Sequence, residues 1–464
     1  NWTDAADMVV VGGGGAGFAG AIEAARAGAS VIILEKGGIC GGSTVRSAGM
    51  IMVGGSDLQK ELGFEDSTER FLKTQLGYCG EYNDHDMVRE MCEQSVKQME
   101  FMQDIGRVYD MLDHMKPIWG YDDMDTWAPR TISDANSSTG HFGLLESEVK
   151  KYEYIKVLTD KEATNLIINE DGEVIGVEVS DGYLYRANKG VLLASASFGN
   201  NKEMSKRYNF MNYWALCNEN IAGRNVNSQH ELNTGDGIRM AQDIGADMAL
   251  TTSNCISDFC HLSFDSAYGS ILVNNEGKRF VQENAQWGYL NQMVFNESVR
   301  TNNASGEKTS FWIIADKNSV ANNRYYNSIL NKMTYLASEG YFSLVKKADT
   351  LDELAETTGL PSDNLVKTVE RWNSMVETGE DTDFHRGNLE GFHDFEKMGD
   401  GPYYAFPYIP YSMGSFGGLR ANIDSQIINT EGNPIPRLFG AGEIISGMYT
   451  APFYNSCGWS ILGT

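Results

Sequence analysis

The chain has 464 residues, enough for two domains and a large core. Its 37 Lys and Arg residues against 63 Asp and Glu residues give a formal net charge of −26, and such a surface repels nucleic acid and anionic lipid. No apolar run approaches the ~18 residues that a membrane-spanning helix needs. We therefore expect no nucleic-acid partner and no membrane span.

The seven cysteines lie far apart, and none forms a C-x-x-C pair. An odd number of cysteines without close spacing argues against a disulfide framework and against a zinc or iron–sulfur site in this chain. We therefore expect no metal. The chain begins at Asn1 rather than Met, so our expectation of a cytoplasmic protein leaves open an export signal ahead of it.

The stretch from Met8 to Glu35 has the order of a strand, a helix and a second strand. Met8–Val11 is a short apolar run, typical of a strand buried on both faces. Phe18–Ala27 is rich in Ala and predicts a helix, and Val31–Leu34 predicts the second strand. Such a βαβ unit is the framework on which nucleotide-binding folds hold phosphate groups.

The loop between the first strand and the helix carries the glycine pattern of a dinucleotide site. Gly12, Gly14 and Gly17 form G-x-G-x-x-G, in which they permit a tight turn, the approach of a pyrophosphate and close helix–strand packing, respectively. Glu35 ends the second strand, where a carboxylate accepts hydrogen bonds from ribose hydroxyls. An ordinary glycine-rich turn is the alternative, but the strand, the helix, the second strand and Glu35 at the expected positions favour a dinucleotide site.

Gly41–Thr44 reads GGST and follows the second strand. Its backbone N–H groups and the hydroxyls of Ser43 and Thr44 are suited to a second wall around a pyrophosphate. A flexible loop is the alternative interpretation.

Further along, the pattern predicts the elements of an α/β protein. Glu65–Met111 has apolar residues at helical spacing, and Lys161–Val179 reads as a β-hairpin. Val191–Gly199 predicts an apolar strand, Ile238–Gly245 a helix, and Lys346–Gly379 a helical region.

The middle of the chain differs in composition from its two ends. Residues 246–399 are rich in Asn, Ser and aromatic residues, and we interpret them as an inserted domain. Asn422–Thr464 returns to the glycine-rich composition of the start. The predicted organisation is therefore one discontinuous domain of residues 1–245 and 400–464, interrupted by a second domain.

Six motifs resemble the FAD-dependent fumarate reductase and succinate dehydrogenase flavoprotein superfamily, which includes 3-ketosteroid dehydrogenases and urocanate-type reductases. They are VVVGGGGAGFAG with Glu35, GGST at Gly41–Thr44, the small-residue strand ending in SFG, TGDG at Thr234–Gly237, ILVNNEGKRFVQE at Ile271–Glu283, and PRLFGAGE at Pro436–Glu443. Each motif is weak alone, but the combination is specific and covers nearly the whole chain. The resemblance implies a Rossmann-like FAD-binding domain of the glutathione-reductase type with an inserted α+β capping and catalytic domain.

The resemblance also implies the cofactor FAD, bound non-covalently because no His lies in the GGST region. FAD is expected to lie extended with its adenosine end near Glu35, with Asp236 and Glu443 along it and Ser460–Leu462 at the flavin ring. The full set of residues expected to bind it is Gly12, Gly14, Gly15, Ala16, Gly17, Glu35, Lys36, Gly42, Ser43, Thr44, Ser47, Gly49, Ala163, Ala194, Asp236, Gly442, Glu443, Ser460, Ile461 and Leu462. The chain has no second complete G-x-G-x-x-G site for nicotinamide, so we expect an external electron carrier.

The chain departs from the fumarate reductase pattern at the substrate-binding residues. In that branch an Arg four residues after the Glu of the GKRF segment delivers the proton, whereas Glu283 is followed at that position by Trp287, whose indole cannot serve as the acid. The His-His-Thr run of that branch is replaced by Met413-Gly414-Ser415, and no Arg stands within Tyr454–Gly458. Fumarate and succinate are therefore disfavoured as substrates.

The last stretch resembles the 3-ketosteroid dehydrogenase branch more closely. There a Tyr and a Gly four residues later hydrogen-bond a ketone oxygen, and Tyr454 and Gly458 have that spacing. The candidates for proton handling are, in falling order, Tyr289, Tyr268, His261 and Tyr449. Packed aromatics with satisfied hydroxyls are the alternative for Tyr454 and Tyr289, and a structural histidine is the alternative for His261.

The prediction is an FAD enzyme that reduces a C=C bond conjugated to a carbonyl in an apolar, ring-containing substrate such as a 3-oxosteroid. Trp287 is expected in an apolar wall of the pocket, with packing in the core as the equal alternative. The superfamily often serves anaerobic respiration, which favours reduction over the reverse oxidation. One alternative is a reductase of a small unsaturated acid, which needs an Arg such as Arg46, Arg130 or Arg420 in the pocket. A flavin-binding electron-transfer or sensor protein is the alternative without catalysis.

Overall fold

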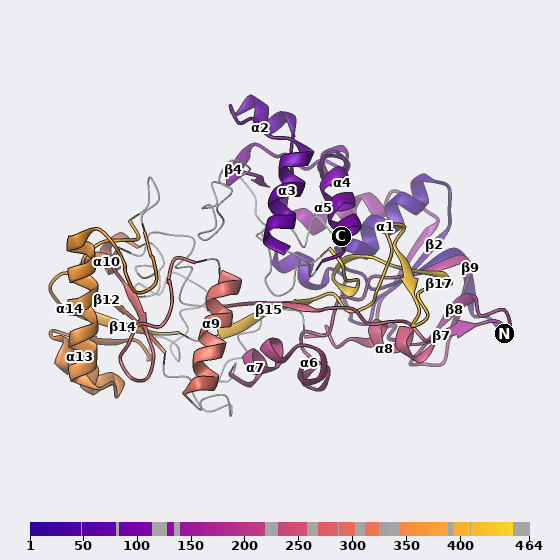
Figure 1. The fold of residues 1–464 in the computed structure, drawn as a ribbon. Helices are drawn as coiled ribbons and strands as arrows, with labels where there is room; N and C mark the ends of the chain where they lie inside the picture. The colour runs from indigo at the N-terminus through magenta and orange to yellow at the C-terminus, as the bar shows by residue number, and fades with distance from the viewer. Residues whose placement is uncertain are drawn as a thin grey trace.

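The computed structural model describes residues 1–47, 49–79, 83–113, 128–133, 140–218, 231–257, 268–285, 287–301, 311–323, 344–387, 393–408 and 410–448, together with Tyr326 and Leu330. The part of the protein built on its main sheet and a second body of sheet and helices lie at opposite ends of the molecule in Figure 1. The N-terminus of the chain lies at the first of these ends.

Eight strands form the main sheet. Its path runs β16-β17-β9-β1-β2-β6, and β8 and then β7 extend it from β9. The strands are β1 (Asp4–Val11), β2 (Val31–Leu34), β6 (Ile155–Leu158), β7 (Ala163–Ile168), β8 (Val174–Val179), β9 (Leu184–Leu193), β16 (Gln426–Ile428) and β17 (Pro434–Gly440). The pairs β1–β2, β1–β9, β2–β6 and β9–β17 are parallel, so the mixed α/β fold with a largely parallel sheet is confirmed.

The central strands are apolar on both faces, which explains why they read as unbroken apolar runs. Val10 and Ile33 face a core formed with α1 (Gly15–Arg26) and α5 (His141–Val149). Val9 and Ile32 face the opposite core, which includes Ile238 of α8 (Asp236–Asp243) and the β7–β8 hairpin. The sheet therefore lies between two apolar layers, and a short glycine-rich turn leads from the end of β1 into α1.

A smaller helical layer covers one side of this part of the protein. It contains α2 (Asp57–Glu61), α3 (Thr68–Cys79), α4 (His85–Asp104) and a three-stranded sheet in the order β3-β5-β4, formed by Ile51–Met52, Thr131–Ser133 and Met111–Asp113. The short turn η1 (Gly42–Arg46) connects this layer to β2. The helices predicted within Glu65–Met111 are confirmed as α3 and α4.

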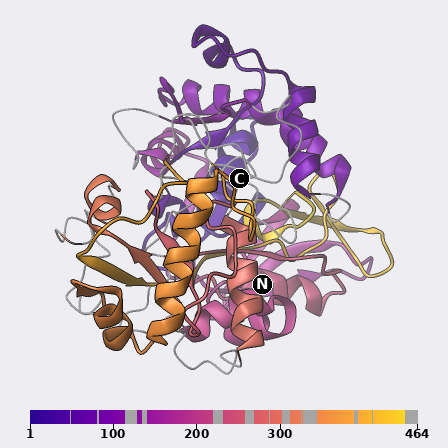
Figure 2. The same cartoon turned by 60° about the vertical axis from the view of Figure 1, so that its left-hand side comes forward.

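The second body is built on a four-stranded antiparallel sheet, β11-β12-β14-β13. Its elements are β11 (Ile271–Val273), α9 (Trp287–Arg300), β12 (Trp312–Ala315), α10 (Lys317–Asn322), β13 (Lys346–Ala348), α13 (Leu351–Thr358), α14 (Ser362–Thr378) and β14 (Tyr403–Pro407). Ile271 and Ile314 pack with α13 and α14 on one face, and the neighbouring Leu272 and Ile313 pack on the other with Val294 of α9. In Figure 2 the orange helix α14 comes to the front of the molecule.

Two antiparallel strands, β10 (Thr252–Ser257) and β15 (Pro410–Phe416), connect the two bodies, and α7 (Phe210–Asn218), which follows α6 (Lys202–Tyr208), packs beside them (Figure 1). We propose the two-domain division predicted from composition, with one change. Because β14 pairs with β12 and β13, we place the second boundary after Pro407 rather than at residue 399.

Two predicted elements differ from the observed ones. The strand predicted over Val191–Gly199 ends at Leu193, because the chain turns at Ala196, which has a positive φ of 57°. The helical region predicted over Lys346–Gly379 begins with strand β13 before α13 and α14. The predicted hairpin over Lys161–Val179 is confirmed as β7 and β8, and the predicted helix over Ile238–Gly245 is α8, which begins two residues earlier.

Candidate cofactor site

In the glycine-rich segment after β1, one glycine has room for a side chain and two others have none. A Cβ on Gly12, which has a φ of 111°, would lie 2.4 Å from the carbonyl oxygen of Ala194, and a Cβ on Gly17 would lie 2.0 Å from that of Gly12. A Cβ on Gly14 would meet nothing within 4 Å. Gly12 and Gly17 therefore serve the packing of strand and helix, and Gly14 stands at the open N-terminal end of α1, where a phosphate group is favoured.

The carboxylate of Glu35 holds the two loops that follow β1 and β2. Its Oε2 accepts the Gly13 N–H at 2.8 Å, and its Oε1 accepts the Gly37 N–H at 2.6 Å. A carboxylate has about four acceptor positions, so these two bonds leave capacity for ribose hydroxyls.

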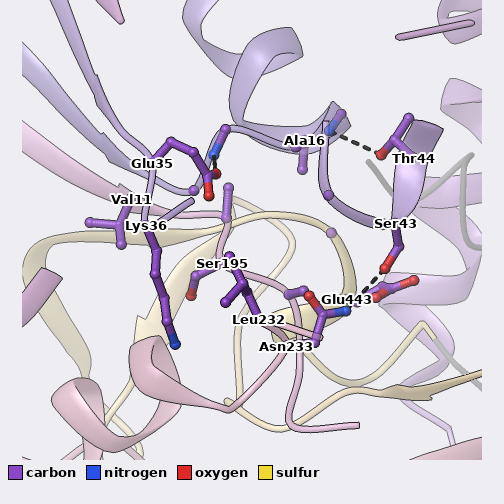
Figure 3. A pocket seen from close by; sticks show the side chains of 18 of the residues that line it. Val11, Ala16, Glu35, Lys36, Ser43, Thr44, Ser195, Leu232, Asn233 and Glu443 are labelled. Atoms are coloured by element: carbon purple, nitrogen blue, oxygen red, sulfur yellow. Dashed lines mark hydrogen bonds between the residues drawn. The ribbon is translucent and has the colours of Figure 1, made fainter. Parts of the chain in front are cut away.

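The turn η1 lies against the glycine-rich loop. The Gly41 N–H donates to the Gly13 carbonyl at 2.8 Å, and the Gly15 N–H donates to Thr44 Oγ1 at 3.1 Å. The GGST segment thereby forms the second wall of the groove in front of α1 (Figure 3).

Lys36, which follows β2, meets Asp236, the first residue of α8. Lys36 Nζ donates to Asp236 Oδ2 and to Thr234 Oγ1, both at 2.8 Å, and Thr234 Oγ1 donates to the same Asp236 oxygen at 2.8 Å. The chain segments around residues 36 and 236 are thus joined along one side of the groove.

The groove brings together most of the residues predicted to bind the cofactor. Its lining includes Gly12, Gly14, Gly15, Ala16, Glu35, Lys36, Gly42, Ser43, Thr44, Ser47, Ala163, Ala194, Asp236, Gly442 and Glu443. Two predicted glycines do not line the groove: Gly17 lies within α1, and Gly49 packs close to Arg107 and His141. Ser460, Ile461 and Leu462 lie outside the described residues. That these lining residues contact FAD is our proposal.

Glu443 enters the groove from the 3₁₀ turn η5 (Gly442–Ile444), directly after β17. Burial raises the pKa of this carboxyl to about 7. Near neutral pH the protonated carboxyl, which can donate a hydrogen bond, and the carboxylate, which only accepts, are therefore both accessible.

Sequence reasoning missed several lining residues, among them Lys161, Glu162, Ser195, Leu232 and Asn233. Ser195 follows the end of β9, and its buried hydroxyl has no hydrogen-bond partner among the described residues. Asn233 directly precedes the TGDG motif, and Lys161 and Glu162 directly precede β7. In the sequence, the one sign that these residues line the groove is that they lie next to predicted elements. That sign is weak, because only the folded chain brings them to the groove.

The residues predicted to handle the substrate are less completely described. Tyr454, Gly458, His261 and Tyr449 lie outside the described residues. Trp287 begins α9, and Tyr289 follows on the same turn, with 39% of its surface exposed. Tyr268 stacks on His393 with ring centroids 5.0 Å apart. Their roles stay predictions.

The groove residues fit FAD. The open space at Gly14 faces the start of α1, as a pyrophosphate requires, and Glu35 stands where ribose hydroxyls would approach. The unpartnered Ser195 hydroxyl and the Glu443 carboxyl add polar groups for the remainder of an extended dinucleotide. FAD, when bound, supplies hydride exchange with the substrate.

Comparison with known families decides the assignment. A family model described as an FAD binding domain matches residues 7–461. The chain belongs to this family, within the fumarate reductase and succinate dehydrogenase flavoprotein superfamily. The predicted family, the FAD cofactor and the predicted fold class are confirmed.

Relatives in this family include two reductases and a dehydrogenase. The chain is 32% identical to digoxin reductase of Eggerthella lenta, with 100% of this chain and 86% of the relative aligned. It is 30% identical to urocanate reductase of the same organism, with 94% and 69% aligned. It also matches the structure of 3-ketosteroid-Δ4-(5α)-dehydrogenase from Rhodococcus jostii in complex with 4-androstene-3,17-dione, with a TM-score of 0.74, 26% identity, and 100% and 96% coverage.

The protein is accordingly an FAD-dependent oxidoreductase that acts on CH–CH and C=C bonds. In the part of the chain that the structure describes, no helix is both long enough and apolar enough to cross a membrane.

Proposed function

We propose that the protein reduces a C=C bond conjugated to a ketone in an apolar, ring-containing substrate such as a 3-oxosteroid. The 4-androstene-3,17-dione in the structure of the Rhodococcus relative is a compound of this kind, with a ring double bond beside a 3-oxo group. Two relatives are named as reductases, which supports reduction over the dehydrogenase direction. An external electron carrier and a cytoplasmic location are parts of this proposal.

The observation that carries the choice of a ketone is the environment of Arg130. A pocket for a small dicarboxylate needs an arginine that can bind carboxylate in bidentate fashion. Arg130 instead binds Asp66 in this way, with Nε–Oδ2 and Nη2–Oδ1 distances of 2.7 Å and with both side chains almost fully buried. Removing it from Asp66 would leave a buried, unpaired carboxylate, so it serves the helical layer rather than a substrate.

The other two arginines considered for an acid substrate are also engaged. Arg46 pairs with Glu231 at 3.2 Å, and Arg420 lies 3.6 Å from Asp247. Both arginine side chains are well exposed, and exposed side chains of this kind do not form the desolvated clamp that a small dicarboxylate requires.

In this proposal the substrate ketone is polarised by the Tyr454 hydroxyl and the Gly458 N–H, as the resemblance to ketosteroid dehydrogenases implies. A hydroxyl and a backbone N–H that converge on one carbonyl oxygen stabilise the negative charge developing there. Tyr289 is our first candidate for proton transfer and Trp287 for the apolar wall of the pocket.

The experiment compares two substrate panels on the flavin-loaded protein with a reduced dye as electron source. One panel contains 4-androstene-3,17-dione and digoxin, and the other contains fumarate and urocanate. We expect saturated products from the first panel only, identified by chromatography. Turnover of the acids alone would contradict the proposal and favour the alternative that urocanate reductase represents.

A Tyr454→Phe variant tests the carbonyl contact in the same assay. We expect a fall in kcat of the order of 100-fold with the enone, because one donor to the developing oxyanion is lost. Tyr403→Phe is the matched control, since the Tyr403 hydroxyl donates to the Gly399 carbonyl in the second body, away from the groove.

A further inference from the structure

Asn233 stands in a short segment of chain that is held in place on both sides. Its carbonyl oxygen accepts the Asn200 N–H at 2.9 Å. The next residue, Thr234, receives the Asn201 side-chain amide on its carbonyl at 2.9 Å and the Lys36 ammonium on its hydroxyl at 2.8 Å. The Asn233 side chain is therefore presented to the groove by a backbone with little freedom to move.

The side chain of Asn233 reaches across the groove. Its Nδ2 donates to Ser43 Oγ at 3.0 Å, although the two residues are 190 positions apart in the chain, and Asn233 is only 6% exposed. Figure 3 shows Ser43, Asn233 and Glu443 together at the end of the groove away from Glu35. Three separate segments thus contribute one polar group each to a single place, which we call the Asn233 cluster (Ser43, Asn233 and Glu443).

The position of the cluster relative to α1 identifies the part of the cofactor that it faces. Glu35 marks the adenosine end, and Gly14 at the start of α1 marks the pyrophosphate. The Asn233 cluster lies beyond the helix start, so the next part of an extended FAD, the ribityl chain, would pass beside it.

The chemistry of the cluster suits that chain. A carboxamide has two N–H donors and an oxygen acceptor, and the bond to Ser43 uses one donor. A hydroxyl, an amide and a carboxyl with a pKa near 7 supply both hydrogen-bond donors and acceptors. The hydroxyl groups of a polyol each donate and accept hydrogen bonds, so they can pair with both kinds of group. We propose that Asn233 is a cofactor-positioning residue that hydrogen-bonds the ribityl hydroxyls of FAD together with Ser43 and Glu443. The proposal rests on FAD occupying the groove.

Binding measurements on flavin-free protein test the assignment. The probes are FAD, followed by quenching of its fluorescence, and ADP, which carries the adenosine and pyrophosphate but no ribityl chain. For Asn233→Ala we expect FAD affinity to fall about tenfold and ADP affinity to stay within about twofold. Equal weakening of both ligands would overturn the assignment, because it would place the effect at the shared part of the cofactor or in the groove as a whole.

A double-mutant cycle with Ser43→Ala separates cofactor binding from a merely structural bond between the two loops. If Asn233 contacts FAD, Asn233→Ala still weakens FAD binding in the Ser43→Ala background. If Asn233 acts only by holding Ser43, it has no further effect there, and the proposal fails. Asn165→Ala, which removes an exposed amide bonded to Glu178 outside the groove, should leave both affinities unchanged.

Two controls keep the outcomes distinct. Asn233→Asp preserves the shape but removes the N–H donors, so it tests the same contact if the alanine variant is unstable, and a wild-type FAD affinity for this variant would contradict the proposal. Wild-type protein that binds neither FAD nor ADP would refute the cofactor site itself rather than the role of Asn233.

Discussion

At the scale of single residues, the groove depends on where a side chain is absent as much as on where one is present. Gly12 and Gly17 have no room for a Cβ because backbone carbonyls lie within 2.4 Å of its position. At Gly14 an added Cβ would meet no protein atom within 4 Å. Gly14 is therefore explained by the cofactor rather than by packing. At Glu443 a side chain is present, and its burial disfavours the charged form of the carboxyl.

Gly14→Ala should separate cofactor binding from folding. The φ of −88° at Gly14 suits Ala, so we expect the flavin-free protein to lose less than about 1 kcal/mol in free energy of unfolding. FAD affinity should fall on the order of 100-fold, because the added methyl group stands where the pyrophosphate approaches. Urea unfolding and FAD titration measure the two quantities, and Gly143→Ala, at another site with no atom within 4 Å, is the control. Unchanged FAD affinity would show that the phosphate lies elsewhere.

Glu443 should make the flavin-free protein less stable as the pH rises. Its pKa is raised to about 7 in the folded state, from 4.5, so its contribution to stability is complete below pH 4.5 and is lost as the pH rises through 7. Glu443→Gln should remove that part of the pH dependence and make the variant relatively more stable at pH 8 than at pH 5. Thermal unfolding at both pH values checks this, and parallel pH profiles for the two proteins would refute it.

At the scale of elements, a buried charge network holds the second body together. Arg279 binds Glu283 through two bonds of 2.8 and 2.7 Å and also binds Asp381, and Arg386 lies 3.2 Å from Glu283. Burial alone would raise the pKa of Glu283, but the two guanidinium groups outweigh it and hold that pKa below its usual value. The arginine of the GKRF motif is therefore explained here by its buried pairing with Glu283 and with Asp381, which follows α14.

Glu283→Gln should destabilise the protein by about 3 kcal/mol or more, because it leaves two buried guanidinium groups with less compensating charge. Glu276→Gln is the matched control, since Glu276 makes half-exposed pairs with Lys278 and Arg300 and should cost less than about 1 kcal/mol. Urea unfolding at pH 7 compares the two variants. Similar losses for both would mean that the buried network does not carry the stability assigned to it.

Elements with one clear local signal were predictable, and those set by tertiary contacts were not. Val31–Leu34 was predicted with its observed bounds because all four side chains are apolar and buried. The end of β9 was missed because Ala194–Ala196 continue the strand as a run of small residues while the backbone turns away. Ser195 and Asn233 were missed as groove residues because no local pattern predicts which loops meet in front of α1.

At the scale of the whole molecule, the two ends of the chain form one sheet and one groove. β17 pairs with β9 beside β1, which places Glu443 opposite the glycine-rich loop that follows β1. The similarity of composition between the two ends predicted their meeting, since both supply the small residues that a dinucleotide groove needs. The substrate could not be read in the same way, because its pocket depends on single side chains from distant segments.

The most direct test of the account is one anaerobic spectrum of the purified protein during a single turnover. We predict a flavin absorption corresponding to one FAD per chain, which is bleached by a chemical reductant and recovers when 4-androstene-3,17-dione is added. Recovery with fumarate or urocanate and not with the steroid would contradict the proposed substrate. A colourless protein that takes up no added FAD would contradict the account as a whole.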